Sequence, residues 1–188
     1  IPLLVSNNHY ISDKKFVDYI DLLPNKQFRG KYRVFRILNK PNNIWKLKQQ
    51  KFDVFHPTYY DPYFLKFFGK KPFVLTVYDM IHEKFSEMFP VTDKTTEQKR
   101  LLVEKATKII AISESTKKDL IEIFGTDESK IEVVYLGNSM FPKSDIKLGF
   151  DIPKKYLFFV GSRGLYKNFE RFIKSISELL NQDNELFV

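Results

Sequence analysis

Short apolar runs alternate with longer amphipathic stretches along this chain, and this alternation is the feature that most constrains its fold. Several of the runs are rich in Val, Ile and Phe with no polar alternation, which is typical of strands buried on both faces of a sheet. The expected strands cover residues 52–56, 73–78, 108–112, 131–136 and 156–160, with a further strand that begins at Leu186. Strands that alternate with helices predict βαβ units, and therefore an α/β fold with a doubly wound parallel sheet.

Helical patterns fill the intervals between these strands. Residues 96–106 predict a helix that leads directly into the next strand. Ser113 offers a hydroxyl group that can cap a helix over residues 117–124, and Gly125 supplies the C-terminal stop. A last helix begins at Asn168 and carries its apolar side chains on one stripe, namely Phe169, Phe172, Ile173, Ile176, Leu179 and Leu180.

A linker divides the chain into two parts of unequal length. Residues 137–155 contain two Gly and two Pro and show no clear period, so a domain boundary is expected there. Residues 1–150 would form one α/β domain. Residues 151–188 hold one strand, one loop and one helix, which is the opening unit of a second α/β domain.

Composition narrows the classes of partner. The 188 residues carry a formal net charge of +8, which suits nucleic acid, an anionic membrane surface or a phosphorylated small molecule. The chain contains no Cys, so it has no disulfides and no thiolate metal sites, which fits a reducing compartment. No apolar run approaches the length needed to span a bilayer.

The first candidate site is a loop that could hold a diphosphate. An apolar run ends at Gly161, a loop of small residues follows with Ser162, Arg163 and Lys167, and a helix pattern opens directly afterwards. Glycine lets the backbone approach a phosphate, a helix N-terminus offers free N–H groups, and the cations neutralise charge. The alternative, an ordinary turn with two solvated cations, is weighted equally.

The second candidate site follows the expected strand at residues 73–78. Tyr78, Asp79, His82 and Glu83 are crowded at the carboxyl end of this strand, which is the edge where open parallel sheets bind ligands. A His beside carboxylates can act as a base. The alternative is that His82 caps a helix or is a satisfied surface group.

Two aromatic segments precede that strand. Residues 56–63 hold Tyr59 and Tyr60 among prolines, a stiff loop suited to stacking on a sugar, although an aromatic-filled turn is the preferred interpretation. Residues 64–71 interleave rings with lysines. These rings either pack in the core, which is favoured, or rest on an anionic membrane surface.

These segments, in this order, resemble the retaining glycosyltransferases of the GT-B fold that use nucleotide-sugar donors (the "group 1" family). Bacterial members that build capsular and O-antigen polysaccharides are especially similar. The matching pieces are SNNHYI, DVFHPTYYDPYFL, KPFVLTVYDMIHEKF, ATKIIAISESTKKDLIEIF, KIEVVYLGNS and YLFFVGSRGLYKNFERFIKSI. The resemblance implies a Rossmann-like N-terminal acceptor domain lacking its first strand, followed by the first βα unit of a C-terminal donor domain. It also implies a fragment that is inactive alone.

The resemblance also assigns roles to residues. Arg163 and Lys167 would contact the donor diphosphate, with Gly161 and Ser162 shaping the loop. Asp79 would lie in the acceptor cleft near the reacting carbon, with His82 as a second catalytic residue. Tyr59, Tyr60 and Tyr78 would bind the acceptor, and Tyr78 stands where many relatives have His.

The expected function is transfer of a sugar from a nucleotide-sugar to a glycan or lipid-linked acceptor in polysaccharide biosynthesis. No metal or other cofactor is expected, since the cations supply what Mg²⁺ would, and no nucleic-acid partner is expected. The protein would be cytoplasmic, either free or peripheral at the inner face of the plasma membrane. The alternative is a non-catalytic basic module that binds a glycan or nucleic acid.

Overall fold

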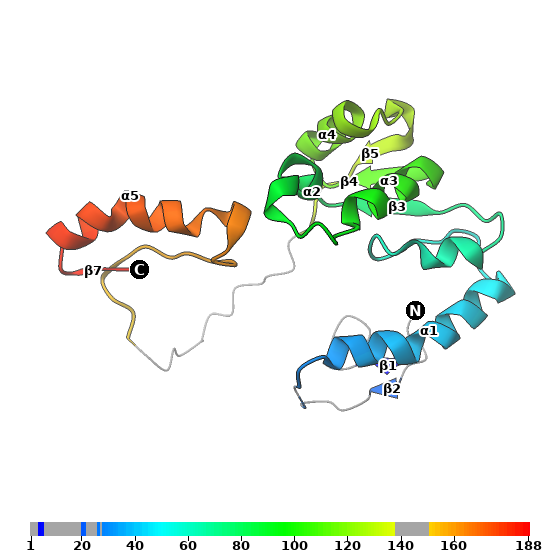
Figure 1. The fold of residues 1–188 in the computed structure, drawn as a ribbon, viewed down its shortest axis with the longest axis horizontal. Coiled ribbons are helices and arrows are strands. Elements are labelled where there is room, and N and C mark those ends of the chain that lie inside the picture. The colour runs from blue at the N-terminus through cyan, green and yellow to red at the C-terminus, as the bar shows by residue number, and fades with distance from the viewer. Residues whose placement is uncertain (1–3, 6–19, 22–25, 27, 138–150) are drawn as a thin grey trace. The chain divides into compact units, whose positions relative to one another are not determined.

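The computed structural model describes residues 4–5, 20–21, 26, 28–137 and 151–188 (Figure 1). The chain divides into two compact units. The first comprises residues 1–79 and 94–134, and the second comprises residues 80–93 and 135–188.

A three-stranded parallel sheet is the centre of the first unit. It has the order β3-β4-β5, formed by Val74–Val77, Lys108–Ala111 and Ile131–Val133. Helices alternate with these strands: α3 (Thr95–Lys105) precedes β4, and α4 (Glu114–Phe124) with the 3₁₀ turn η3 (Glu128–Lys130) precedes β5. This arrangement confirms the predicted α/β class with parallel strands.

Strands β3 and β4 are fully buried on one face and at most half-buried on the other, so the burial on both faces that their continuous apolar runs predict holds for one face only. Leu75 and Val77 of β3 and Ile109 and Ala111 of β4 are fully buried. Helix α4 packs against β4 and β5, with Leu120 fully buried. The core of this unit therefore lies at the sheet and beneath α4.

The predicted caps of α4 are confirmed. The Ser113 hydroxyl accepts a hydrogen bond from the Thr116 backbone N–H at 3.1 Å, which satisfies one free donor of the first turn. Gly125 ends the helix in the left-handed region, at φ 65°, where a residue without Cβ is favoured. Helix α4 therefore begins at the carboxyl end of β4, only three residues after Ala111.

Aromatic side chains form a second part of the core of this unit. Phe64 lies on the 3₁₀ turn η1 (Pro62–Lys66) and contacts the rings of Phe55, Phe68 and Phe73 at centroid distances of 4.8, 5.4 and 5.3 Å. Phe64, Phe68 and Phe73 are buried. The core interpretation of residues 64–71 is therefore right for these rings, and they are not available to a membrane surface.

The strand predicted at residues 52–56 is wrong in extent. Phe55 forms only an isolated parallel bridge with Phe73, because its N–H donates to Pro72 and its carbonyl accepts from Val74. The next donor of a parallel ladder would be the N–H of residue 57, and Pro57 has none.

The structure also contains a helix that the sequence patterns did not predict. Helix α1 spans Lys31–Gln49 and includes Pro41. It contacts the short strand β1 (Leu4–Val5), which pairs in parallel with β2 (Ile20–Asp21).

The second unit contains a βα element near the end of the chain. Strand β6 (Lys155–Tyr156) pairs in parallel with β7 (Leu186–Phe187), and the elements between them are η4 (Leu165–Lys167) and α5 (Phe169–Gln182). The strand predicted at 156–160 is observed only as Lys155–Tyr156, which pair with Leu186 and Phe187. Residues 80–93 contribute α2 (Ile81–Lys84) and η2 (Ser86–Met88).

An ion pair supports the β6–β7 pairing. Lys155 Nζ lies 3.0 Å from Asp183 Oδ2, and this hydrogen bond raises the pKa of Lys155 and lowers that of Asp183. Among the described residues, no helix has the length and the apolar character needed to cross a membrane.

Candidate functional site

The carboxyl edge of the β3-β4-β5 sheet brings together polar residues from two strand ends. Tyr78 and Asp79 follow β3, and Ser113 follows β4. Because β3 and β4 are parallel and paired in register from Val74↔Lys108 to Val77↔Ala111, both ends open at the same edge. Figure 1 shows the adjacent strands with α4 next to them. Ligands of open parallel sheets bind at this edge.

Three buried side chains hold the backbone of Tyr78 and Asp79 by hydrogen bonds. The Tyr78 N–H donates to the Tyr60 hydroxyl at 3.1 Å. The Thr116 hydroxyl donates to the Tyr78 carbonyl at 3.4 Å, and the Lys99 ammonium donates to the Asp79 carbonyl at 2.9 Å. We call Tyr60, Lys99 and Thr116 the backbone clamp; all three belong to the first unit.

Each member of the clamp comes from a different element. Tyr60 precedes η1, where the Asp61 carboxylate accepts from the Tyr63 N–H and begins the turn. Lys99 lies in the middle of α3, and Thr116 lies in the first turn of α4. The exposed fractions of the clamp residues are only 4%, 0% and 5%, respectively. Their positions are therefore fixed by the packing of the unit.

The environment of Lys99 compensates for the burial of a cation. Its Nζ lies 5.0 Å from the centroid of the Tyr60 ring, where the electron-rich face of the ring attracts positive charge. Buried ammonium groups are costly unless they are paired and hydrogen-bonded. The ring of Tyr60 and the carbonyl of Asp79 thus supply polar contacts to a side chain that has no access to solvent.

This geometry changes the assignment of Tyr60. The sequence placed Tyr59, Tyr60 and Tyr78 together as acceptor-binding residues. Tyr59 and Tyr78 are 59% and 41% exposed to solvent. Tyr60 is buried and its hydroxyl accepts a hydrogen bond from the Tyr78 N–H, so its ring is not open to a ligand in this structure.

One polar contact at this edge was not singled out by sequence. His56 Nε2 lies 2.8 Å from Thr76 Oγ1, which joins the residue after the Phe55 bridge to β3. His56 is exposed. Its position directly after an apolar run is the signal that could have identified it.

His82 lies in the second unit, where its ring contacts two neighbouring side chains. It belongs to the short helix α2, its ring stacks on Phe89 at a centroid distance of 4.0 Å, and Nε2 lies 3.6 Å from Asp93 Oδ2. The other ring nitrogen, Nδ1, is buried without a hydrogen-bond partner among the described residues, so these neighbours satisfy His82 only in part.

The candidate diphosphate loop also lies in the second unit. Gly161 has a φ of +145°, a conformation that side-chain-bearing residues rarely adopt. The Arg163 guanidinium lies 5.1 Å from the Phe169 ring, and Lys167 Nζ lies 5.0 Å from the Tyr166 ring. A 3₁₀ turn at Leu165–Lys167 separates the loop from α5, whose first turn begins at Phe169.

Arg163 and Lys167 are exposed cations. Within residues 151–188, both side chains are exposed, and neither is paired with a carboxylate. Ring contacts orient the two cations without neutralising them. No three His, Asp or Glu side chains in the described part of the chain gather as a metal site would require.

Replacing Lys99 with methionine tests the backbone clamp. The change keeps the length of the side chain but leaves the Asp79 carbonyl without its ammonium donor. We expect the free energy of unfolding to fall by about 1–3 kcal/mol, measured by urea denaturation. Lys105→Met, an exposed position on the same helix, should stay within about 0.5 kcal/mol of wild type. Equal stability of the two variants would mean that Lys99 does not support Asp79.

Comparison with known protein families matches this chain to one of them. The sequence model described as Glycosyltransferase Family 4 matches residues 9–138, which is more than half of the 188 residues. The matched range includes the sheet, the backbone clamp and Asp79. No curated protein matched the chain.

Proposed function

Because this chain belongs to glycosyltransferase family 4, a family of retaining enzymes, we propose that it transfers a sugar from a nucleotide-sugar to a hydroxyl group of a glycan or lipid-linked acceptor. We place this reaction in the assembly of a bacterial surface polysaccharide of the capsule or O-antigen type. The observation that carries the proposal is the family match over residues 9–138, which covers the polar carboxyl edge of a parallel sheet.

We assign the acceptor to the edge formed by Tyr78 and Asp79. Tyr78 and Tyr59 supply exposed rings, which suit the apolar faces of a sugar. Asp79 supplies a carboxylate on a backbone that three buried side chains hold. A fixed carboxylate can accept hydrogen bonds from acceptor hydroxyls and stabilise positive charge on a nearby carbon without reorganising.

The donor diphosphate is assigned to the loop from Gly161 to Lys167. This assignment is supported by the glycine conformation and by the two exposed, unneutralised cations. In addition, the first N–H groups of α5 have no partners within the helix and carry a partial positive charge.

The bond changes define what these groups must do. The bond between the anomeric carbon and the diphosphate oxygen breaks, and the diphosphate departs with the electron pair. The acceptor oxygen bonds to the same carbon on the same face of the sugar, and its proton passes to the departing diphosphate oxygen. Positive charge develops on the sugar while negative charge grows on the diphosphate. Cations fixed at the diphosphate lower the barrier because they interact more strongly with the departing group than with the bound donor.

The test uses the protein that contains these residues, with UDP-glucose, UDP-N-acetylglucosamine and GDP-mannose as donors and a bacterial lipid extract as acceptor. We expect nucleoside diphosphate release that depends on the extract, with a product of unchanged anomeric configuration by NMR. Inverted configuration would contradict the proposal. Absence of turnover together with oligonucleotide binding that weakens steeply with salt would favour the basic binding module instead.

A further inference from the structure

Helix α1 has its apolar and polar residues on unexpected sides. Its buried positions are Lys31, Phe35, Asn39 and Leu47, two of which are polar. Its apolar residues recur instead at helical spacing on another side, namely Val34, Ile37, Leu38, Pro41, Ile44 and Trp45. Residues spaced in this way share one face of a helix. We call this face the α1 apolar stripe.

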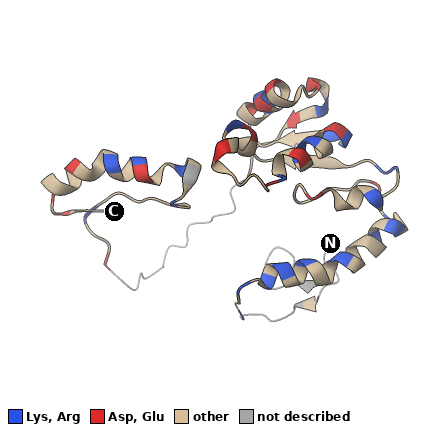
Figure 2. Cartoon of the chain, in the orientation of Figure 1, with Lys and Arg blue, Asp and Glu red and all other residues tan. Residues whose placement is uncertain are grey.

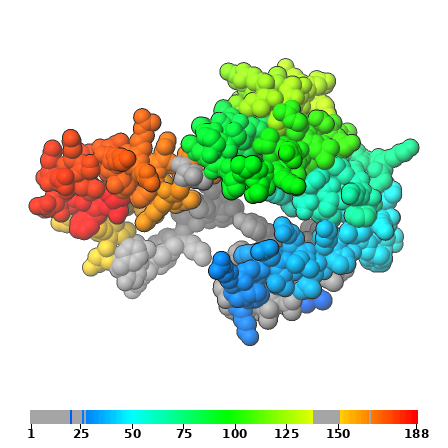
Figure 3. Space-filling view, viewed as in Figure 1, coloured from blue at the N-terminus to red at the C-terminus, as the bar shows by residue number. Residues whose placement is uncertain are grey.

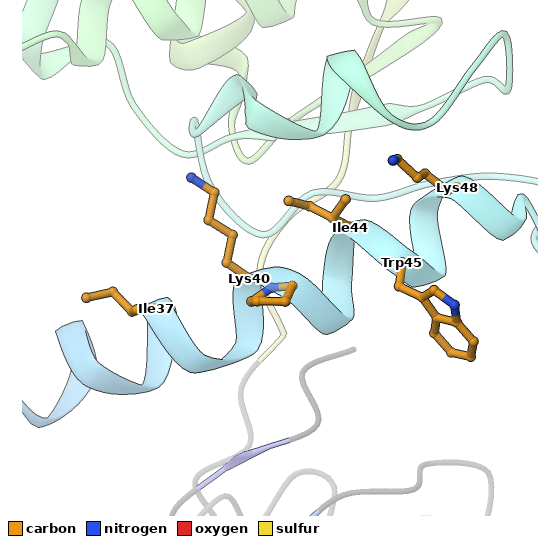
Figure 4. Close-up of a pocket in the computed structure, with 6 residues that line it drawn as sticks. Ile37, Lys40, Ile44, Trp45 and Lys48 are labelled. Atoms are coloured by element: carbon orange, nitrogen blue, oxygen red, sulfur yellow. The ribbon is translucent and has the colours of Figure 1, made fainter.

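The α1 apolar stripe is largely open to solvent. Ile37, Leu38 and Trp45 are 68%, 49% and 60% exposed. A groove of about 490 Å³ runs along the stripe (Figure 4). In this view Ile44 and Trp45 lie toward opposite edges of the stripe, and their side chains project in different directions. The side chains of α1, coloured blue to cyan, are visible at the surface in the space-filling view (Figure 3).

Cations border the α1 apolar stripe. Helix α1 carries six Lys and Arg residues and no Asp or Glu, which Figure 2 shows as blue without red along the helix. Arg33 and Arg36 are exposed. Lys40 and Lys48 line the groove, and their ammonium groups lie 5.8 and 5.7 Å from the rings of Tyr63 and Phe67.

From this combination we infer that α1 docks on an anionic membrane surface. A helix with a basic side and a stripe containing Trp, Ile and Leu lies in the interfacial plane of a bilayer, with the apolar side chains among the acyl chains. Its cations then reach the negative headgroups, to which long basic side chains extend readily. The absence of acidic residues from α1 gives charge complementarity to such a surface along the whole helix. This proposed membrane contact is separate from the proposed transfer reaction and does not depend on it.

The chain supplies its own reporter for this contact. Trp45 is the single Trp of the sequence, so intrinsic fluorescence excited at the indole band reports on the α1 apolar stripe alone. The whole protein is mixed with phosphatidylcholine vesicles, with or without phosphatidylglycerol. We expect a blue shift of the emission, and co-flotation of the protein, only with the anionic vesicles. Binding should weaken with added salt, because salt screens the lysine and arginine charges.

Two sets of variants separate the contribution of the apolar side chains to vesicle binding from that of the cations. Ile37→Ser should lower vesicle binding by roughly tenfold, because an exposed apolar side chain no longer enters the bilayer. Arg33→Gln with Arg36→Gln should lower it by roughly fivefold for each charge removed. Because these side chains are exposed, circular dichroism should remain that of the wild type.

Matched controls use two lysines at the end of η1 and just after it. Lys66→Gln with Lys70→Gln removes the same charge from exposed positions outside α1 and should leave vesicle binding within about twofold of wild type. Equal loss in this control would mean that net charge, rather than α1, attracts the membrane. Failure of the wild type to bind anionic vesicles would overturn the inference. So would a concentration-dependent dimer that Ile37→Ser dissociates, since a second copy would then occupy the stripe.

Discussion

Replacing Lys167 with alanine is expected to lower the rate of sugar transfer by about a hundredfold. Lys167 is exposed and lies in η4 just before α5, with its ammonium group 5.0 Å from the centroid of the Tyr166 ring. Its removal should therefore leave the fold unchanged while it removes a charge from the departing diphosphate. The measurement is kcat and KM for the nucleotide-sugar, together with the thermal midpoint. If Lys167 acts mainly on the departing group, the loss should appear in kcat more than in KM.

A cation on the same unit provides the control for this prediction. Lys174 is exposed and lies farther along α5, past its first turn. Lys174→Ala removes the same charge and should reduce transfer by less than about threefold, since the effect of an exposed charge is screened over distance. Undiminished turnover of Lys167→Ala, or equal loss in both variants, would remove Lys167 from the mechanism.

The parts of the fold that were predictable depend on local patterns. The strands at 73–78 and 108–112 could be recognised because their apolar runs supply fully buried residues of the sheet, namely Leu75, Val77 and Ile109. The ends of α4 could be predicted because the residues there cap a helix. The Ser113 hydroxyl accepts from a backbone N–H of the first turn, and the Gly125 N–H donates to carbonyls of the last turn.

The parts that were not predictable depend on contacts between distant segments. Lys99 reaches the Asp79 carbonyl across 20 positions, and nothing in the sequence around Lys99 distinguishes it from a solvated lysine. The contact between His82 and Asp93 likewise could not be predicted from the residues around either side chain. The burial and the partners of such side chains depend on how whole elements pack. For this reason the sequence alone assigned Tyr60 to a ligand, whereas the structure buries Tyr60 and bonds its hydroxyl to the Tyr78 backbone.

Helix α1 was missed for a different reason. Pro41 lies inside it, and a proline usually ends or kinks a helix. The spacing of Ile37, Leu38 and Ile44 was nevertheless a helical signal. The structure shows that this signal marks an exposed stripe, whereas amphipathic patterns commonly mark the face toward the core.

Replacing Asp79 with asparagine is the second change with a large expected effect on catalysis. The variant keeps the size of the side chain, and the clamp holds the backbone of this residue, so the structure should be retained. Only the negative charge and the ability to accept a proton are lost. Groups that transfer protons or stabilise developing charge commonly contribute about a hundredfold or more, so kcat should fall by at least that factor.

The control for Asp79→Asn distinguishes a specific carboxylate from a general change in charge. Asp53 is an exposed carboxylate of the same unit, and Asp53→Asn alters the net charge equally. Its turnover should remain within about twofold of wild type, since surface charges far from the reacting atoms are screened. A further comparison uses Lys99→Met, which keeps the Asp79 carboxylate but loosens its backbone. If position matters as well as charge, Lys99→Met should lower kcat less than Asp79→Asn does, with native circular dichroism in both variants. Wild-type turnover of Asp79→Asn would exclude this carboxylate from the reaction, and the acceptor would have to be assigned to another part of the sheet edge.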